Sequence, residues 1–429
     1  MTHQGLSNYQ KSAEFKTPDS DYDEITIDVV GNVDSGKSSL CGILSDARIR
    51  ENIENIKEVL DDGNGLARSR IVSLKHEKVS GKTSSIGYYY MGVDSHKPKP
   101  RIISLVDLCG HENYLKTTIT GVTGSYPNHG LVLIAKNITH MTREHYCILT
   151  TMGVPVLFVL TKMDITPQRI VADNIEKINI MGKRFGKELI EIKTPQDIEL
   201  CSEKTNGFIR ISNKTGEGIP LLIEYISNIK NKPRKLLNGF SVDSVYPNVT
   251  GFGIVVAGMN GTRINKGDSM YITINNEFLP VKIRSIHNDY RHFVDVLNPG
   301  IRGCLCIRFD SKNKPGFIRK GSIITHEPCN VQLVKKFIAQ VAIFRGKSSN
   351  IKVGYNSYIN IGLVRGSIQF NSIKDKETGL DIEILNTGRH AIVEIEFIHH
   401  LNCISIDDKF LFRNQRTCGI GKVISHKFY

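Results

Sequence analysis

The stretch GNVDSGKSS, residues 31–39, decides the fold of the amino-terminal half. It follows the alternating run ITIDVV at residues 25–30 and precedes the apolar residues 40–44. This order predicts a strand, a glycine-rich loop and a helix. The spacing GxxxxGKS is typical of a phosphate-binding loop, whose backbone N–H groups surround phosphate oxygens at a helix N-terminus. A chance glycine turn is the alternative, and the flanking strand and helix patterns argue against it.

This loop is expected to touch the phosphates of a nucleotide directly. Lys37 would bring positive charge to the β- and γ-phosphates, and the Ser38 hydroxyl would bind Mg²⁺. The predicted phosphate-binding residues are Asn32, Val33, Asp34, Ser35, Gly36, Lys37, Ser38 and Ser39.

A second nucleotide signature follows a predicted buried strand at residues 101–106. The sequence there continues as DLCGH, in which Asp107 and Gly110 have Asp-x-x-Gly spacing. Asp107 would hold Mg²⁺, usually through water, and the Gly110 N–H would sense the γ-phosphate. The motif alone is weak, but its position downstream of a phosphate-binding loop and at a strand end makes it informative.

A third signature selects the base. Residues 130–135 and 154–160 are continuous apolar runs, which predicts parallel strands covered on both faces. The second run ends in TKMD, where the Asp164 carboxylate can accept hydrogen bonds from the ring N–H and exocyclic amino group of guanine. Adenine lacks that donor pair, so the motif favours GTP and GDP over ATP. The predicted base-site residues here are Thr161, Lys162 and Asp164.

A fourth signature, SNK, follows a predicted strand at residues 207–211 and would back the base with Ser212, Asn213 and Lys214. All four signatures lie at the carboxyl ends of predicted strands. That edge is where doubly wound sheets bind their ligands.

The excess positive charge falls entirely in the second half of the chain. Residues 1–230 contain 28 Lys and Arg against 28 Asp and Glu, whereas residues 231–429 contain 28 against 15. This asymmetry suggests that the second half faces a polyanion such as RNA. A merely solubilising basic surface is the alternative. The candidate RNA-contacting residues are Lys312, Lys314, Arg319, Lys320, Lys335, Lys336, Arg413 and Arg416.

Composition also indicates the cellular compartment in which the protein works. The chain has no apolar run of about 18 residues, so no transmembrane helix or membrane partner is expected. The N-terminus lacks the apolar region of a secretory signal. Nine scattered cysteines favour a reduced, cytoplasmic protein. The pair Cys304-x-Cys306 lies in a strand-like run and is expected to pack rather than bind metal.

The predicted organisation comprises four parts. Residues 1–22 form a flexible tail, 23–230 a GTP-binding G domain, 231–330 β-barrel domain II and 331–429 β-barrel domain III. Within the G domain, residues 47–60 are predicted to be one helix. Residues 61–87 are too long and polar for a plain connection, so they are either functional or disordered.

With these motifs, the chain resembles the translational GTPases of the elongation factor Tu/1-alpha superfamily, and within it the branch of GTP-binding proteins one and two. The branch-like stretches are DGNGLARSR, KHEKVSGKTSSIG, DLCGHENYLKTTITGVTG and TKMDI, and FLFRNQRTCGIGKVI resembles the last barrel's closing segment. The resemblance implies an α/β P-loop GTPase domain, with a mostly parallel sheet and helices on both faces, followed by two β-barrels. It also implies Mg²⁺-dependent hydrolysis of GTP to GDP and phosphate.

The resemblance assigns roles to further residues. Thr83 matches the switch threonine that binds Mg²⁺ beside Ser38 and Asp107, although Ser84 and Ser85 are close enough to take that register. His111 matches the histidine that orients the attacking water; a solvent-facing loop histidine is the alternative. Lys82 stands where elongation factors carry an isoleucine, which puts the apolar gate over His111 in doubt.

Three functions fit this pattern. The first is an elongation-factor-like, cytoplasmic, monomeric GTPase that acts with tRNA or other RNA and with the ribosome. The second is a GTP-dependent binding switch in RNA surveillance or signalling, without ribosome-stimulated turnover. The third is a carrier role in nucleotide-linked metabolism, which the lack of any further catalytic domain disfavours. No arginine finger is apparent in cis, so intrinsic hydrolysis is expected to be slow.

Overall fold

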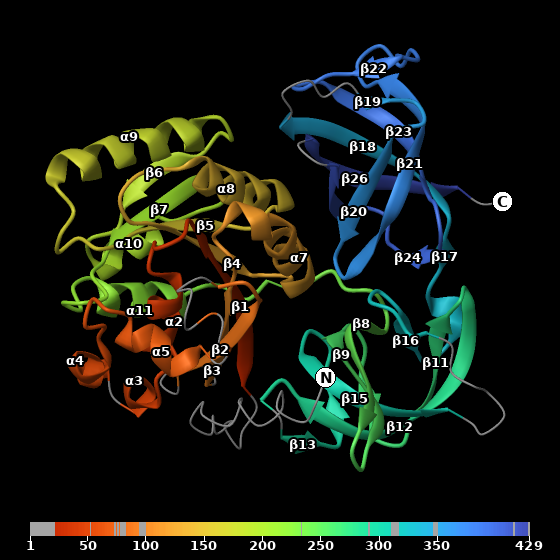
Figure 1. Ribbon diagram of the computed structural model, residues 1–429, viewed down its shortest axis with the longest axis horizontal. Coiled ribbons are helices and arrows are strands. Elements are labelled where there is room, and N and C mark those ends of the chain that lie inside the picture. The colour runs from red at the N-terminus through yellow and green to blue at the C-terminus, as the bar shows by residue number, and fades with distance from the viewer. Residues whose placement is uncertain are drawn as a thin grey trace. The chain divides into compact units, whose positions relative to one another are not determined.

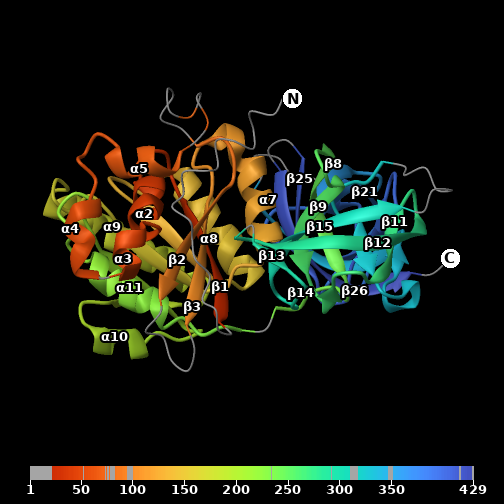
Figure 2. The ribbon, with the colours of Figure 1, turned by 90° about the horizontal axis from the view of Figure 1, so that it is seen from below.

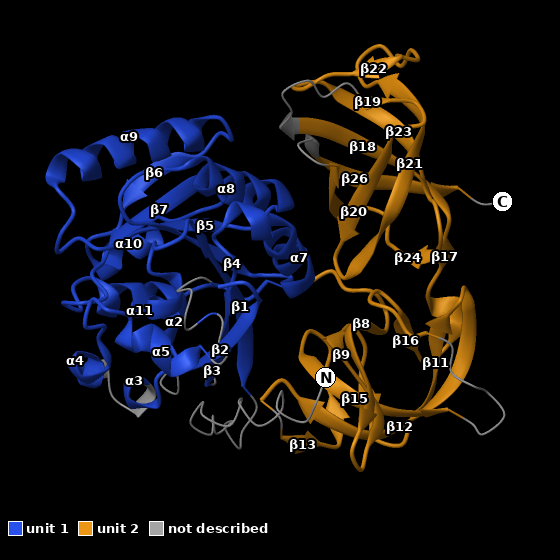
Figure 3. Ribbon diagram, in the orientation of Figure 1, with its two compact units in different colours: residues 1–232 blue, residues 233–429 orange. Residues whose placement is uncertain are grey.

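The computed structural model describes residues 22–51, 53–72, 74, 77, 83–93, 100–232, 234–290, 292–309, 317–345, 351–414 and 417–427. The predicted tail lies outside these residues except for Tyr22, and Lys82, Lys312, Lys314 and Arg416 also lie outside them. The chain forms two compact units, residues 1–232 and residues 233–429 (Figure 3).

A seven-stranded sheet forms the centre of the first unit (Figure 1). Its strand order is β2-β3-β1-β4-β5-β7-β6, and every neighbouring pair is parallel except β2 with β3. The strands are β1 (Asp23–Gly31), β2 (Gly87–Val93), β3 (Arg101–Asp107), β4 (His129–Ile134), β5 (Val156–Leu160), β6 (Glu188–Glu191) and β7 (Thr205–Arg210). Strands β3, β4 and β5 are buried along their whole length, which explains their continuous apolar sequence.

Helices cover both faces of this sheet (Figures 1 and 2). Leu40 and Ile43 from α2, and Leu222 and Ile226 from α11, pack with strand residues in one core. Helices α7 and α8 contact β1, and α9 contacts β6. The helices are α2 (Lys37–Leu44), α3 (Ala47–Glu51), α4 (Ile56–Val59), α5 (Leu66–Ile71), α7 (Leu115–Ser125), α8 (His140–Met152), α9 (Gln168–Lys183), α10 (Pro195–Glu199) and α11 (Ile219–Ser227), with 3₁₀ turns η1 (Ile53–Asn55) and η2 (Glu112–Tyr114).

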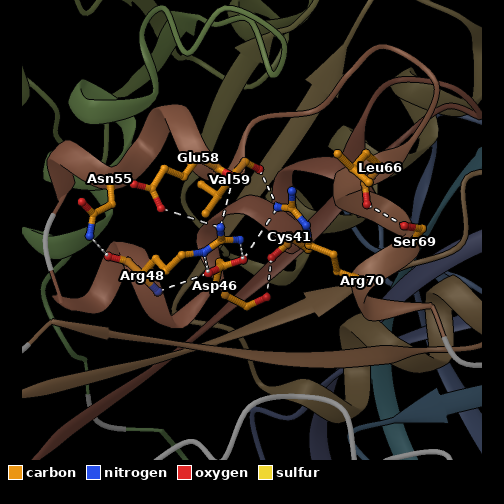
Figure 4. A network of polar contacts seen from close by, with 10 residues as sticks. Cys41, Asp46, Arg48, Asn55, Glu58, Val59, Leu66, Ser69 and Arg70 are labelled. Atoms are coloured by element: carbon orange, nitrogen blue, oxygen red, sulfur yellow. Dashed lines mark hydrogen bonds and ion pairs between the residues drawn. The ribbon is translucent and has the colours of Figure 1, made fainter.

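The predicted single helix at residues 47–60 is instead divided into α3, η1 and α4. The Asn55 side-chain amide donates to the Arg48 carbonyl at 3.1 Å, which satisfies that carbonyl outside a continuous helix. The Arg48 guanidinium lies between Asp46, at 2.9 Å, and Glu58, at 3.8 Å (Figure 4). These contacts fold the segment back on itself, so local periodicity was a poor guide to this region.

The second unit begins with a closed six-stranded barrel. Its strand order is β11-β16-β8-β9-β15-β12, closed by pairing of β11 with β12. The strands are β8 (Phe240–Val249), β9 (Gly253–Asn260), β11 (Ser269–Ile274), β12 (Glu277–Asn288), β15 (Arg302–Phe309) and β16 (Ile323–Thr325), with short strands β10 (Ile264–Asn265), β13 (Phe293–Val294) and β14 (Val296–Leu297) and the turn η3 (Pro328–Asn330). Cys306 on β15 is buried, and its thiol donates to the Phe252 carbonyl at 3.0 Å.

A second closed barrel follows, with strand order β18-β23-β21-β20-β25-β26. Its core contains buried phenylalanines 337, 370, 397, 410 and 412. The strands are β18 (Lys336–Arg345), β20 (Asn356–Ile361), β21 (Val364–Asp375), β23 (His390–Phe397), β25 (Lys409–Asn414) and β26 (Thr417–Lys427), with short strands β17 (Leu333–Val334), β19 (Ile351–Lys352), β22 (Ile384–Leu385) and β24 (Asn402–Cys403). The predicted α/β sheet domain followed by two barrels is confirmed.

No helix within the described ranges is both long enough and apolar enough to cross a membrane.

Candidate active site

The loop between β1 and α2 is wrapped around the Lys37 side chain. Lys37 is buried, and its Nζ donates to the carbonyls of Gly31, at 3.0 Å, and Asn32, at 2.8 Å. Asp34 and Gly36 have left-handed φ angles of 60° and 86°, which lets the loop turn tightly before the helix begins. Burial lowers the pKa of Lys37, while the negative charge of Asp107 opposes that shift. A phosphate bound at this loop would therefore lie beside the buried amino group of Lys37.

The loop opens onto a cavity of about 840 Å³. Most of the predicted site residues line it: Asn32, Val33, Asp34, Ser35, Gly36, Lys37, Ser38, Ser39, Thr83, Gly110, His111, Lys162, Asp164, Asn213 and Lys214. The remaining predicted residues do not line the cavity, but each is hydrogen-bonded to a residue that does. These are Thr161, bonded to Ser35, Ser212, bonded to Asp164, and Asp107, bonded to Ser38.

Three oxygen-bearing side chains meet at one side of the cavity. The Ser38 hydroxyl donates to Asp107 Oδ2 at 2.6 Å and lies 3.1 Å from the Thr83 hydroxyl. The other carboxylate oxygen, Asp107 Oδ1, is buried and has no hydrogen-bond partner among the described residues. Burial raises the pKa of Asp107, which the charge of Lys37 and the Ser38 hydrogen bond oppose. An orphaned carboxylate oxygen beside two hydroxyls fits Mg²⁺, a cation that prefers oxygen ligands.

Gly110 and His111 follow β3 and face the loop. A Cβ at Gly110 would lie 2.6 Å from the Gly31 carbonyl oxygen, so only glycine fits in this backbone arrangement. His111 is half-buried, and its Nδ1 accepts from the Asn113 N–H at 3.2 Å. Because Nδ1 accepts this bond, Nε2 is the ring nitrogen left to act as a donor. The His111 ring makes an edge contact with Tyr114, with centroids 6.0 Å apart.

The far end of the cavity combines the third and fourth signatures. The Ser212 hydroxyl donates to Asp164 Oδ1 at 2.7 Å, which fixes the carboxylate and leaves Oδ2 for a ligand. The Thr161 hydroxyl donates to the Ser35 carbonyl at 2.8 Å, and the Asn213 amide donates to the Gly36 carbonyl at 3.2 Å. These bonds attach the base end directly to the phosphate loop.

Comparison with known proteins places this arrangement in a family. The family described as "Elongation factor Tu GTP binding domain" matches residues 23–232. This region is an elongation factor Tu-type GTPase domain. This match supports GTP and GDP as the nucleotides of residues 23–232, and the predicted relationship to the elongation factor Tu/1-alpha superfamily is confirmed.

Similarity extends beyond the GTPase domain. GTP-binding protein 1 of Xenopus laevis is 29% identical over 94% of this chain, and the chain spans 64% of that protein's length. Two solved structures share the fold. The S. cerevisiae Ski7 GTPase-like domain bound to GTP has a TM-score of 0.72 at 17% identity, covering 94% of this chain and 97% of that one. Elongation factor SelB from Methanococcus maripaludis with GppNHp has a TM-score of 0.65 at 20% identity, covering 95% and 80%.

The GTPase domain also contains cavity-lining residues that the motifs did not identify. Asp61, Gly63, Asn64, Gly65 and Arg68 come from the polar stretch that precedes β2. Arg70 on α5 anchors this stretch by donating to the Val59 carbonyl at 2.7 Å (Figure 4). The length and polarity of the stretch indicated function or disorder without distinguishing them, and its DGNGLARSR segment carried the family resemblance without assigning a role to these residues.

Five of the eight candidate RNA-contacting cations are described, and at least four of these five make polar contacts within the second unit. Arg319 donates to the Leu401 carbonyl at 2.6 Å and to Asn402 Oδ1 at 2.9 Å. Lys320 lies 3.5 Å from Asp243, and Lys335 and Lys336 lie 3.9 and 3.3 Å from Glu396. Arg413 is half-buried on β25, and Lys312, Lys314 and Arg416 lie outside the described residues.

Proposed function

We propose that this protein is a translational-type GTPase that hydrolyses GTP to GDP and phosphate and acts, as a cytoplasmic monomer, with tRNA and the ribosome. The proposed organisation is a G domain at 23–230 and barrels at 231–330 and 331–429. The observation that supports it best is the convergence of phosphate, metal and base residues on one cavity, in a chain that continues into two barrels. The fold shared with SelB, an elongation factor, agrees with this role.

The chain's own residues would carry out the reaction mainly by positioning and charge. Lys37 would neutralise the β- and γ-phosphates, and the Gly110 N–H would contact the γ-phosphate. Ser38, Thr83 and Asp107 would hold Mg²⁺, which would neutralise charge that develops on the phosphates. His111 Nε2–H would bind the attacking water and hold it in line with the γ-phosphate. Asp164 would select guanine.

RNA would bind a basic face of the first barrel. Lys282 on β12 and Arg308 on β15 are direct cross-strand partners and are both exposed. Like charges directly opposite one another destabilise a strand pair, and a polyanion would relieve that repulsion. Lys282 and Arg284 line a hollow of about 600 Å³, together with Lys266 and its ion-pair partner Asp295, 3.6 Å away. Lys282, Arg284 and Arg308 replace the sequence clusters as the strongest candidates, because the described members of those clusters are largely engaged in internal contacts.

Filter binding of tRNA across a salt series tests this face. The double variant Lys282→Ala/Arg308→Ala should bind more weakly, and the slope of log affinity against log salt should fall by about one for each phosphate that the protein no longer neutralises. Lys193→Ala is the matched control, since its side chain is 70% exposed on the GTPase domain. An unchanged slope in the double variant would remove the first barrel as the RNA-binding surface.

Turnover with and without ribosomes tests the proposed activity. We expect slow intrinsic hydrolysis and strong stimulation by ribosomes. His111→Ala should abolish most of the stimulation and leave GTP affinity nearly unchanged, because the histidine would act mainly in the transition state. A large loss of GTP affinity would instead make His111 structural. Hydrolysis without ribosome stimulation would favour a GTP-dependent binding switch in RNA surveillance or signalling.

A further inference from the structure

Glu77 is a buried carboxylate in the polar stretch between α5 and β2, and only 4% of its surface is exposed. One of its oxygens, Oε1, accepts four hydrogen bonds. They come from the backbone N–H groups of Ser84, at 2.8 Å, and Ser85, at 3.1 Å, and from both serine hydroxyls, each at 2.9 Å. Burial raises the pKa of Glu77, but these donors outweigh burial and hold the pKa below its usual value. The group is therefore a charged anchor.

Ser84 and Ser85 connect Glu77 to two parts of the predicted metal site, the Thr83 hydroxyl and the segment that follows Asp107. Thr83 directly precedes Ser84, and its hydroxyl lies 3.1 Å from that of Ser38. The Ser85 carbonyl lies 3.6 Å from the Cys109 sulfur, two residues beyond Asp107. The Cys109 thiol is the donor in this contact, and the Ser85 carbonyl accepts. The segment anchored by Glu77 thus contacts the strand end that carries Asp107.

The backbone carbonyl of Glu77 is also hydrogen-bonded to a residue that lines the cavity. Arg68, which lines the nucleotide cavity, donates from Nη2 to the Glu77 carbonyl at 3.1 Å. Glu77 therefore joins three parts of the site: α5, the Thr83 segment and the turn after β3. It does not line the cavity, so any effect on the nucleotide must pass through the residues that it holds.

We propose that Glu77 is a positioning residue for the GTP-bound state, in which its carboxylate fixes Ser84 and Ser85 and so keeps the Thr83 hydroxyl beside Ser38. The proposal rests on the assignment of Thr83 to the metal site and requires neither RNA nor the ribosome. Switch segments of GTPases are ordered through γ-phosphate and Mg²⁺ contacts, which GDP does not provide. Loss of the anchor should therefore affect GTP and spare GDP.

The test compares the affinities of Glu77→Gln for a non-hydrolysable GTP analogue and for GDP, with Mg²⁺ present. The amide keeps the shape of the side chain but loses the charge that strengthens all four hydrogen bonds. We expect about a tenfold loss of affinity for the analogue and less than about a twofold change for GDP. Glu144→Gln is the matched control, because Glu144 is also buried in the GTPase domain, away from this network. Equal losses for both nucleotides, or no loss, would overturn the proposal.

A double-mutant cycle separates positioning from a folding defect. Ser84→Ala/Ser85→Ala removes two of the four donors and retains the backbone N–H groups, so this variant should fold even if Glu77→Gln does not. It should also lose analogue affinity selectively. Combined with Glu77→Gln, the losses should be less than additive, because all three side chains act through the same contact. Fully additive losses would show that Glu77 does not act through the serines. Failure of tRNA or ribosome binding would leave this result intact.

Discussion

Gly110→Ala tests whether the turn after β3 must contact the phosphate loop. The added Cβ would lie 2.6 Å from the Gly31 carbonyl oxygen, 2.6 Å from Lys37 Nζ and 2.8 Å from the Asn32 carbonyl carbon. Lys37 cannot easily move away, because its Nζ already bonds to both of these carbonyls. The turn must therefore retreat from the loop. Overpacking of this kind costs about 1–3 kcal/mol.

This cost should lower the affinity for GTP, because the γ-phosphate would hold the turn against the loop. We expect affinity for a GTP analogue to fall about 5- to 150-fold. GDP affinity should fall much less, because without a γ-phosphate the turn is free to move. Fluorescent-nucleotide displacement measures both values. Gly366→Ala in the second barrel is the control, since its Cβ would meet Phe397 no closer than 3.5 Å. Equal losses for the two nucleotides would refute the assignment of Gly110 to the γ-phosphate.

Three further predictions concern the base, the metal and acid stability. Asp164→Asn should weaken GTP binding and favour xanthosine nucleotides, because the amide presents a donor where guanine also donates; tight ATP binding by the wild type would contradict this. Chelation of Mg²⁺ should accelerate nucleotide release, and Ser38→Ala should make that release insensitive to chelation. Burial lowers the pKa values of His129 and His145 to about 3, from an ordinary 6.5. Between about pH 3 and pH 6.5, both imidazoles are neutral in the folded protein and protonated in the unfolded chain. Their stabilisation is therefore complete above pH 6.5 and is lost as the pH falls towards 3. Within this window, the pair contributes a slope of roughly 3 kcal/mol per pH unit to the free energy of unfolding. His145→Leu should remove about half of this slope in urea titrations, and an unchanged slope would contradict its burial as a neutral group.

The sequence was most informative where function depends on short, contiguous motifs at strand ends. The loop at residues 31–39 and the motif ending in Asp164 each place several polar groups within a few residues of a buried strand. Parallel strands end at one edge of the sheet, so these separate motifs had to converge. The hydrogen bond from Thr161 to the Ser35 carbonyl is a direct consequence of that convergence.

The sequence was least informative where contacts are made by side chains distant along the chain. Arg68 and Glu77 belong to no general nucleotide-binding motif, and their positions depend on how α5 and its neighbours fold. Lys335 and Lys336 form a basic cluster in the sequence, but both lie close to Glu396 from another strand. Charge density along the chain could not reveal this pairing, since it depends on strand register.

Nucleotide-dependent binding of tRNA to the full chain tests the central claim most directly. Filter binding should be measured with a GTP analogue and with GDP, in Mg²⁺, at several salt concentrations. We predict tighter binding with the analogue, because Thr83 and Gly110 can order their segments only against a γ-phosphate. Binding in both states should weaken steeply with salt. Equal affinity with the two nucleotides would contradict a GTP-controlled role with tRNA, and absence of salt-dependent binding would contradict the RNA-binding surface as well.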